Sequence, residues 1–202
     1  AVVDKIPTIA EAEQETQPES DAPAVPKKVS VRLSLHIVNL SKLHQQLNSE
    51  GFNSVVRRFE KQLQGLLSLY NGQRQFLSGD TLLIDFFGEE FHECSFRAVC
   101  CAQILLNMAA RNPSPRLQLA AAIQPLPEAP QSAGCALVKE FLVQHNNTLT
   151  PNKNEILVNG SLLDTVLQHH AEFDLNSGKL IQIKAPYSEY VSKQEEQLLL
   201  RQ

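Results

Sequence analysis

Long apolar runs, clustered basic residues and regularly spaced cysteines are all missing from this sequence. No stretch of about 18 consecutive apolar residues occurs, so nothing in residues 1–202 is expected to span a membrane. The first thirty residues also lack the apolar core of a signal peptide. The 18 basic and 22 acidic residues give a formal net charge of −4. That balance argues against a nucleic-acid-binding protein, which usually carries a basic domain.

The four cysteines do not suggest a disulfide framework or a metal site. They lie in apolar segments without regular spacing, which is typical of buried free thiols in a reducing compartment (Cys94, Cys100, Cys101 and Cys135). The sequence contains no nucleophile motif, P-loop or dinucleotide-binding fingerprint. We therefore expect no cofactor, no metal, no nucleic-acid partner and a cytoplasmic location.

Composition divides the chain into three parts. Residues 1–28 are rich in proline and acidic residues and contain no aromatic residue, so we expect a disordered linker. Residues 29–191 carry the periodic apolar pattern of one domain, and residues 192–202 are expected to form a helical tail. Because the chain begins with Ala1 rather than Met, we expect it to be the cytoplasmic part of a larger protein, attached to a membrane only through a segment absent from this sequence.

Apolar periodicity predicts an alternation of strands and helices after residue 28. A period of two indicates strands, and apolar residues three or four positions apart indicate helices. The expected strands are 31–37, 73–77, 81–87, 117–124, 155–158, 173–175 and 180–183, and the expected helices are 41–70 with an interruption at Gly51, 93–111, 134–145, 161–169 and 189–202. This order predicts an α+β fold, with a ferredoxin-like βαββαβ core and an added C-terminal αβαββ unit. Both long helices should cover one face of the sheet.

Three segments in series resemble class III nucleotide (adenylate and guanylate) cyclase domains. The first strand reads LSLHIVNLSKL over residues 33–43, and the following hairpin reads GQRQFLSGDTLLIDFFG over residues 72–88. The third segment is the helix around 136–142 together with the strand EILV at 155–158. The order and spacing of all three agree with the cyclase pattern. Diguanylate cyclases share this sheet topology, but their acidic hairpin signature is absent, so that resemblance is weaker.

The resemblance assigns cyclase roles to five positions of this chain. Cyclases bind two metal ions through two aspartates, and these positions correspond to His36 and Asp80. The base-selecting lysine corresponds to Phe76, and the asparagine and arginine of the later helix correspond to Leu137 and Phe141. No arginine lies between Arg116 and Arg201. A degenerate domain, not an enzyme, is therefore expected, because the transition-state cation and one metal carboxylate are not found.

Two hypotheses about the function follow from this resemblance. The first is a regulatory and protein-interaction module that forms a homodimer or binds a partner protein, since cyclase domains pair head to tail. The alternative is a domain that senses a nucleotide or another small molecule in the cleft that corresponds to the cyclase active site. An enzyme with a different chemistry on the same sheet is a weaker third possibility.

Asp80 and His36 also have ordinary structural interpretations. Aspartate is common in tight turns without binding a metal. A histidine on an alternating strand is usually a half-buried or edge side chain. Two interpretations of Asp80 are therefore open: a metal ligand, or a turn residue that binds no metal.

Overall fold

The computed structural model describes residues 29–126 and 149–200. The first half of the fold contains β1 (Val29–Ile37), α1 (Leu40–Gln46), α2 (Ser49–Tyr70), β2 (Gln73–Ser78), β3 (Thr81–Gly88), α3 (Phe91–Arg111) and β4 (Leu119–Pro125). The second half contains β5 (Ile156–Val158), the 3₁₀ turn η1 (Gly160–Leu162), α5 (Thr165–His170), β6 (Ala171–Asp174), β7 (Lys179–Ile183) and α6 (Tyr187–Leu200). This order confirms the predicted α+β fold. The helix expected at 134–145 lies outside the described residues.

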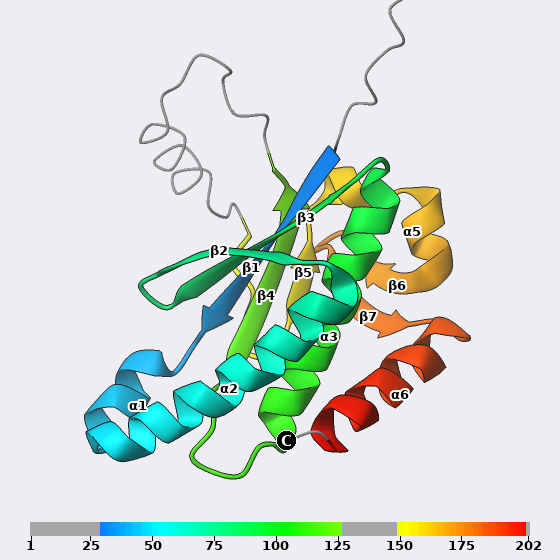
Figure 1. Ribbon diagram of the computed structural model, residues 1–202. Coiled ribbons are helices and arrows are strands. Elements are labelled where there is room, and N and C mark those ends of the chain that lie inside the picture. The colour runs from blue at the N-terminus through cyan, green and yellow to red at the C-terminus, as the bar shows by residue number, and fades with distance from the viewer. Residues whose placement is uncertain (1–28, 127–148, 201–202) are drawn as a thin grey trace, which may run out of the picture.

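The described strands form one seven-stranded sheet in the order β2-β3-β1-β4-β5-β7-β6 (Figure 1). Strand β1 is central to the first half and pairs antiparallel with both β3 and β4. Strand β4 pairs parallel with β5, and the β6–β7 hairpin continues the sheet from there. The first four strands therefore have the ferredoxin-like arrangement predicted from the sequence.

Helices α2 and α3 cover the same face of the sheet, as predicted (Figure 1). Their apolar side chains and the odd-numbered residues of β1 belong to one core cluster, which includes Leu33, Leu35, Phe59, Leu63 and Ile104. Helix α2 is buried unevenly along its apolar side. Its buried residues are Val55, Phe59, Gln62, Leu63 and Leu66, whereas Phe52 and Val56 lie at the margin of the core and are only partly buried.

Side-chain capping separates α1 from α2. The Asn48 side chain accepts a hydrogen bond from the Gly51 backbone N–H and so caps α2 at its first turn. The predicted interruption at Gly51 thus falls three to four residues earlier, at Leu47 and Asn48. At the other end, Asn71 adopts a left-handed conformation with φ 53° and ends the helix.

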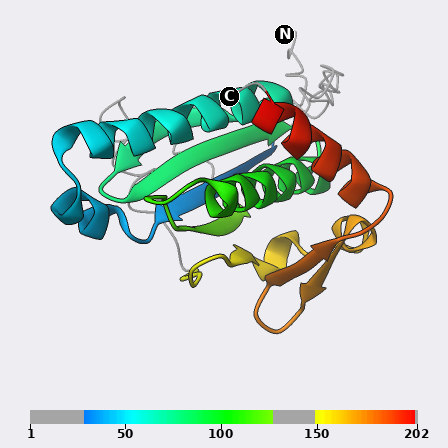
Figure 2. The same ribbon diagram turned by 90° about the horizontal axis from the view of Figure 1, so that it is seen from below.

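Helix α6 runs back from the β6–β7 hairpin toward α2 (Figure 2). It approaches closely at Gly65, where a Cβ atom would lie 2.9 Å from a Leu198 methyl carbon. Glu195 is buried and bonds to Asn107 and Arg111 of α3. The predicted division after residue 191 falls inside this helix. Neither described stretch contains a helix with the length and apolar character needed to cross a membrane.

Candidate functional site

His36 and Asp80, which the resemblance placed at the two cyclase metal positions, lie side by side. His36 is near the end of β1 and pairs in register with Thr81, the first residue of β3. Asp80 precedes Thr81 in the β2–β3 turn, where Gly79 has a φ of +60° that favours glycine. The closest distance between the two side chains is 4.0 Å, from His36 Nδ1 to Asp80 Oδ1.

The Thr81 hydroxyl links the histidine to the carboxylate. It donates a hydrogen bond to Asp80 Oδ1 at 3.1 Å and lies 2.8 Å from His36 Nδ1. Since the hydroxyl has a single proton, the consistent arrangement has Nδ1–H donating to the Thr81 oxygen. The lone pair of the neutral imidazole is then on Nε2. Both ends are accessible, because the His36 side chain is 32% exposed and that of Asp80 is 61% exposed.

This cluster supplies fewer ligands than the metal centre that the resemblance implies. Among the described residues, no group of three or more histidine, cysteine, aspartate or glutamate side chains is placed to hold a metal ion. Magnesium prefers several oxygen ligands, and here one carboxylate stands beside one imidazole. The described residues therefore do not fit a pair of magnesium ions by themselves. Further oxygen ligands would have to come from a nucleotide's phosphates or from a partner domain.

The other three assigned positions remain predictions. Phe76 lies in β2, but its side chain is not among those described. Leu137 and Phe141 lie outside the described residues. The structure thus brings together two of the five assigned positions, and the adjacency of these two follows from the β1–β3 register.

A buried ion pair on the same strands was missed by the sequence analysis. Arg32 and Asp85 face each other in the β1–β3 register. The guanidinium donates two hydrogen bonds to the carboxylate, from Nε to Oδ1 at 2.7 Å and from an Nη to Oδ2 at 2.8 Å. Arg32 is fully buried and Asp85 is 1% exposed. The signal in the sequence was one charged residue of opposite sign in each of two predicted strands, Arg32 in the first and Asp85 in the third.

The described cysteines are poor candidates for nucleophiles. Cys94, Cys100 and Cys101 are free and buried on α3, as expected, while Cys135 lies outside the described residues. Burial raises the pKa of Cys100 and that of Cys101 to about 12. At neutral pH both are therefore thiols, which are far less reactive than thiolates.

Solved structures of nucleotide cyclases share this fold. The guanylate cyclase domain of RhGC from Catenaria anguillulae, solved in complex with GTP, superposes with a TM-score of 0.55 at 12% identity, covering 79% of this chain and 98% of that one. The adenylyl cyclase CyaB from P. aeruginosa gives a TM-score of 0.51 at 11% identity, covering 78% and 95% of the two chains. Comparison of the sequence with protein-family models and with curated proteins found no match.

A third neighbour has been solved in two assembly states. The monomeric guanylyl cyclase domain of the RhoGC fusion protein from Blastocladiella emersonii gives a TM-score of 0.57 at 11% identity, covering 78% of this chain and 98% of that one. The same fusion protein's cyclase domain has also been solved as a non-canonical dimer, with a TM-score of 0.55 at 12% identity and the same coverage. The described fold is therefore that of class III cyclase domains, over nearly their whole length.

The expectation that the chain is not an enzyme is wrong. The neighbours that define its fold are guanylyl and adenylyl cyclases, and the described residues give no positive evidence that cyclase chemistry has been lost. That expectation depended on the missing carboxylate at His36 and on Phe76, Leu137 and Phe141, and the structure does not describe the side chains of the last three. Of the two metal positions, Asp80 retains the carboxylate and lies next to the residue at the other one.

Proposed function

We propose that this chain is a regulatory signalling domain of the cyclase type that acts by pairing with a second cyclase-type domain. In this proposal the cleft formed on pairing contains the end of β1 and the start of β3. His36 and Asp80 then face a bound nucleotide and its metal. The domain is attached to the rest of its protein, and through it to a membrane, by the acidic segment 1–28.

The juxtaposition of His36, Thr81 and Asp80 is the observation that carries this proposal. The β1 end and the β2–β3 turn are the two places at which the resemblance assigns the metal aspartates. The Asp80 carboxylate is 61% exposed and is oriented by a hydrogen bond from the Thr81 hydroxyl. It can therefore bind a hydrated cation without breaking a buried interaction. His36 adds an imidazole nitrogen, a second possible ligand atom, beside this carboxylate.

Pairing is supported by the completeness of the domain. The chain covers 95–98% of the solved cyclase domains compared above, so it includes the elements that a cyclase domain brings to a partner. Because the RhoGC domain has been solved both as a monomer and as a dimer, the pairing is proposed to be reversible and to depend on concentration and nucleotide.

Sedimentation of the full chain across the micromolar range tests this proposal. We expect a monomer–dimer equilibrium that shifts toward dimer when GTP or ATP is added with Mg²⁺ or Mn²⁺. Cyclic nucleotide production is measured in the same samples. Asp80→Asn should abolish the nucleotide-dependent shift, whereas Glu196→Gln, which removes the same charge from the exposed side of α6, should not. A chain that stays monomeric at every concentration, with and without nucleotide, would contradict the proposal.

A further inference from the structure

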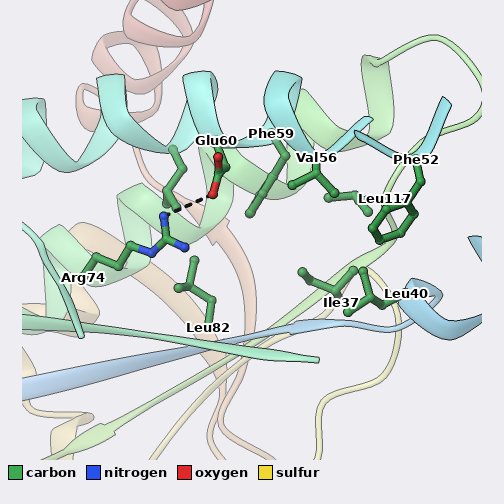
Figure 3. A pocket seen from close by; sticks show the side chains of 10 residues that line it. Ile37, Leu40, Phe52, Val56, Phe59, Glu60, Arg74, Leu82 and Leu117 are labelled. Atoms are coloured by element: carbon green, nitrogen blue, oxygen red, sulfur yellow. Dashed lines mark hydrogen bonds and ion pairs between the residues drawn. The ribbon is translucent and has the colours of Figure 1, made fainter. Parts of the chain in front are cut away.

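An apolar cavity lies between helix α2 and the helix-covered face of the sheet. Its volume is about 170 Å³. Carbon atoms from α1, α2, the first and third strands and the segment before β4 form its walls, including Leu40, Phe52, Val56, Ile37, Leu82 and Leu117 (Figure 3). Protein interiors rarely leave voids larger than one water molecule. This cavity is open at one end, and its walls are almost entirely apolar, so it is suited to hydrocarbon.

The cavity exists because the apolar stripe of α2 does not fit tightly against the strands at this end. Phe52 and Val56 belong to the periodic stripe, yet both remain only partly buried. On the opposite wall, β2 is an edge strand with a register irregularity between Arg74 and Leu77, so it does not continue the sheet regularly below α2. An occupant could therefore enter without separating α2 from the buried centre of the core.

Among the described residues that line this cavity, Arg74 is the one cation, and it lies at one end. Figure 3 shows the Arg74 guanidinium reaching toward Glu60 at the end of the cavity remote from Phe52 and Leu40. The closest approach of the pair is 3.4 Å, between Arg74 Nη1 and Glu60 Oε1. The two side chains are 42% and 51% exposed. An exposed pair of this kind contributes little to stability, so another carboxylate can replace Glu60 at low cost.

Beyond this ion pair the surface is hollowed again. Glu60 and Arg74 also line a second, more polar depression of about 350 Å³, together with Gln64 and Leu67. The ion pair thus separates an apolar chamber from a polar hollow that opens on the surface. A molecule with a hydrocarbon part and a charged end could place the first in the apolar cavity and the second in the polar depression.

We propose that this cavity binds a small amphiphilic carboxylate, with its hydrocarbon part among Ile37, Val56 and Leu82 and its carboxylate on the Arg74 guanidinium. An apolar protein cavity of about 150 Å³ holds benzene, so the hydrocarbon part contains about six carbon atoms. Arginine is the side chain best matched to a carboxylate, because its N–H groups can bond both oxygens. The site is separate from the His36–Asp80 cluster, whose side chains project from the other face of the sheet, and does not depend on the proposed function.

Calorimetric titration of the full chain with sodium hexanoate tests this assignment, with acetate and 1-hexanol as probes that lack the tail or the charge. We expect saturable binding of one hexanoate per chain, no measurable binding of acetate, and binding of hexanol that is at least about tenfold weaker than that of hexanoate. Arg74→Gln should weaken hexanoate binding to the level of hexanol. Arg57→Gln, which removes a cation from the exposed side of α2, should leave it unchanged.

Methyl NMR of the unaltered chain locates the bound probe without any substitution. Hexanoate should shift the methyl signals of Ile37, Val56 and Leu82, and not that of the distant Val166. Val56→Phe, which fills the cavity, should abolish binding if the variant folds. The proposal is overturned if hexanoate does not bind saturably, if it binds without shifting these methyl signals, or if Arg74→Gln leaves its affinity unchanged.

Discussion

The two faces of strand β1 are both buried at residues 32–35 but consist of different kinds of side chain. On the helix-covered face, Leu33 and Leu35 are fully buried among aliphatic and aromatic side chains. On the opposite face, Arg32 and Ser34 are just as inaccessible, and His36 follows them with 32% of its side chain exposed. Apolar contacts have no directional requirement, whereas a buried charge must find a partner with correct geometry. The helix-covered face therefore tolerates imperfect packing, including a cavity. On the opposite face, the buried charge of Arg32 requires its partner Asp85.

Breaking the buried ion pair should have the largest effect on stability. Arg32→Leu leaves the Asp85 carboxylate buried without its guanidinium, and the free energy of unfolding should fall by about 3–5 kcal/mol. Urea denaturation measures this change. The double variant Arg32→Leu/Asp85→Leu, in which neither charge remains, should recover most of the loss. If the double variant is as unstable as the single one, the loss is due to packing and not to the unpaired charge.

The adjacent residue tests the helix-covered face. Leu33→Ala should lower the free energy of unfolding by about 2–5 kcal/mol, because it removes methyl groups from a site with no exposed surface and leaves a cavity. The same measurement on Leu175→Ala, whose leucine is 63% exposed, should show a change below about 0.5 kcal/mol. Similar losses for both variants would mean that the burial described here does not exist in solution.

Substitution of Ser34, unlike the two substitutions above, should increase the stability of the fold. Its hydroxyl is fully buried and has no hydrogen-bond partner among the described residues. Ser34→Ala removes a desolvated polar group, so the free energy of unfolding should rise by about 1 kcal/mol. Ser192→Ala on the exposed side of α6 is the control and should have almost no effect. A clear destabilisation by Ser34→Ala would show that the hydroxyl has a partner in solution.

A partly exposed ion pair, Lys179–Glu155, should affect stability least, and only over part of the pH range. Lys179 at the start of β7 donates a hydrogen bond to Glu155 at 2.8 Å, which together with bonds from Asn152 lowers the pKa of Glu155 from 4.5 to about 2. Because the folded-state pKa is lowered, the carboxylate stabilises the fold above about pH 4.5, and this contribution disappears as the pH falls through 2.

Glu155→Gln should therefore reduce stability slightly near neutral pH, and its difference from the unaltered chain should vanish by about pH 2. Thermal unfolding at a series of pH values measures the difference. Glu196→Gln, at an exposed position on α6, should show no such dependence. A difference that persists at the acidic limit would mean that Glu155 acts through packing and not through its charge.

Much of the fold could be predicted from the sequence because the signals are local. The period-two alternation of residues 31–37 and the apolar spacing of residues 52–70 indicate a strand and a helix whatever their neighbours are. The Gly79-Asp80 turn fixes the pairing of the strands beside it. The His36–Asp80 adjacency needs in addition the β1–β3 register, which pairs His36 with Thr81 and which the local turn does not set.

Only the tertiary structure decided which polar residues are buried and where the core is incomplete. The alternation on β1 shows that Arg32 and Ser34 share a face, but a covered face and an exposed one give the same pattern. The Arg32–Asp85 pair depends on register between strands 53 positions apart. The cavity beside Val56 depends on how α2 sits over an irregular edge strand. Local sequence determines each element, whereas burial and voids arise from packing between elements distant in the chain.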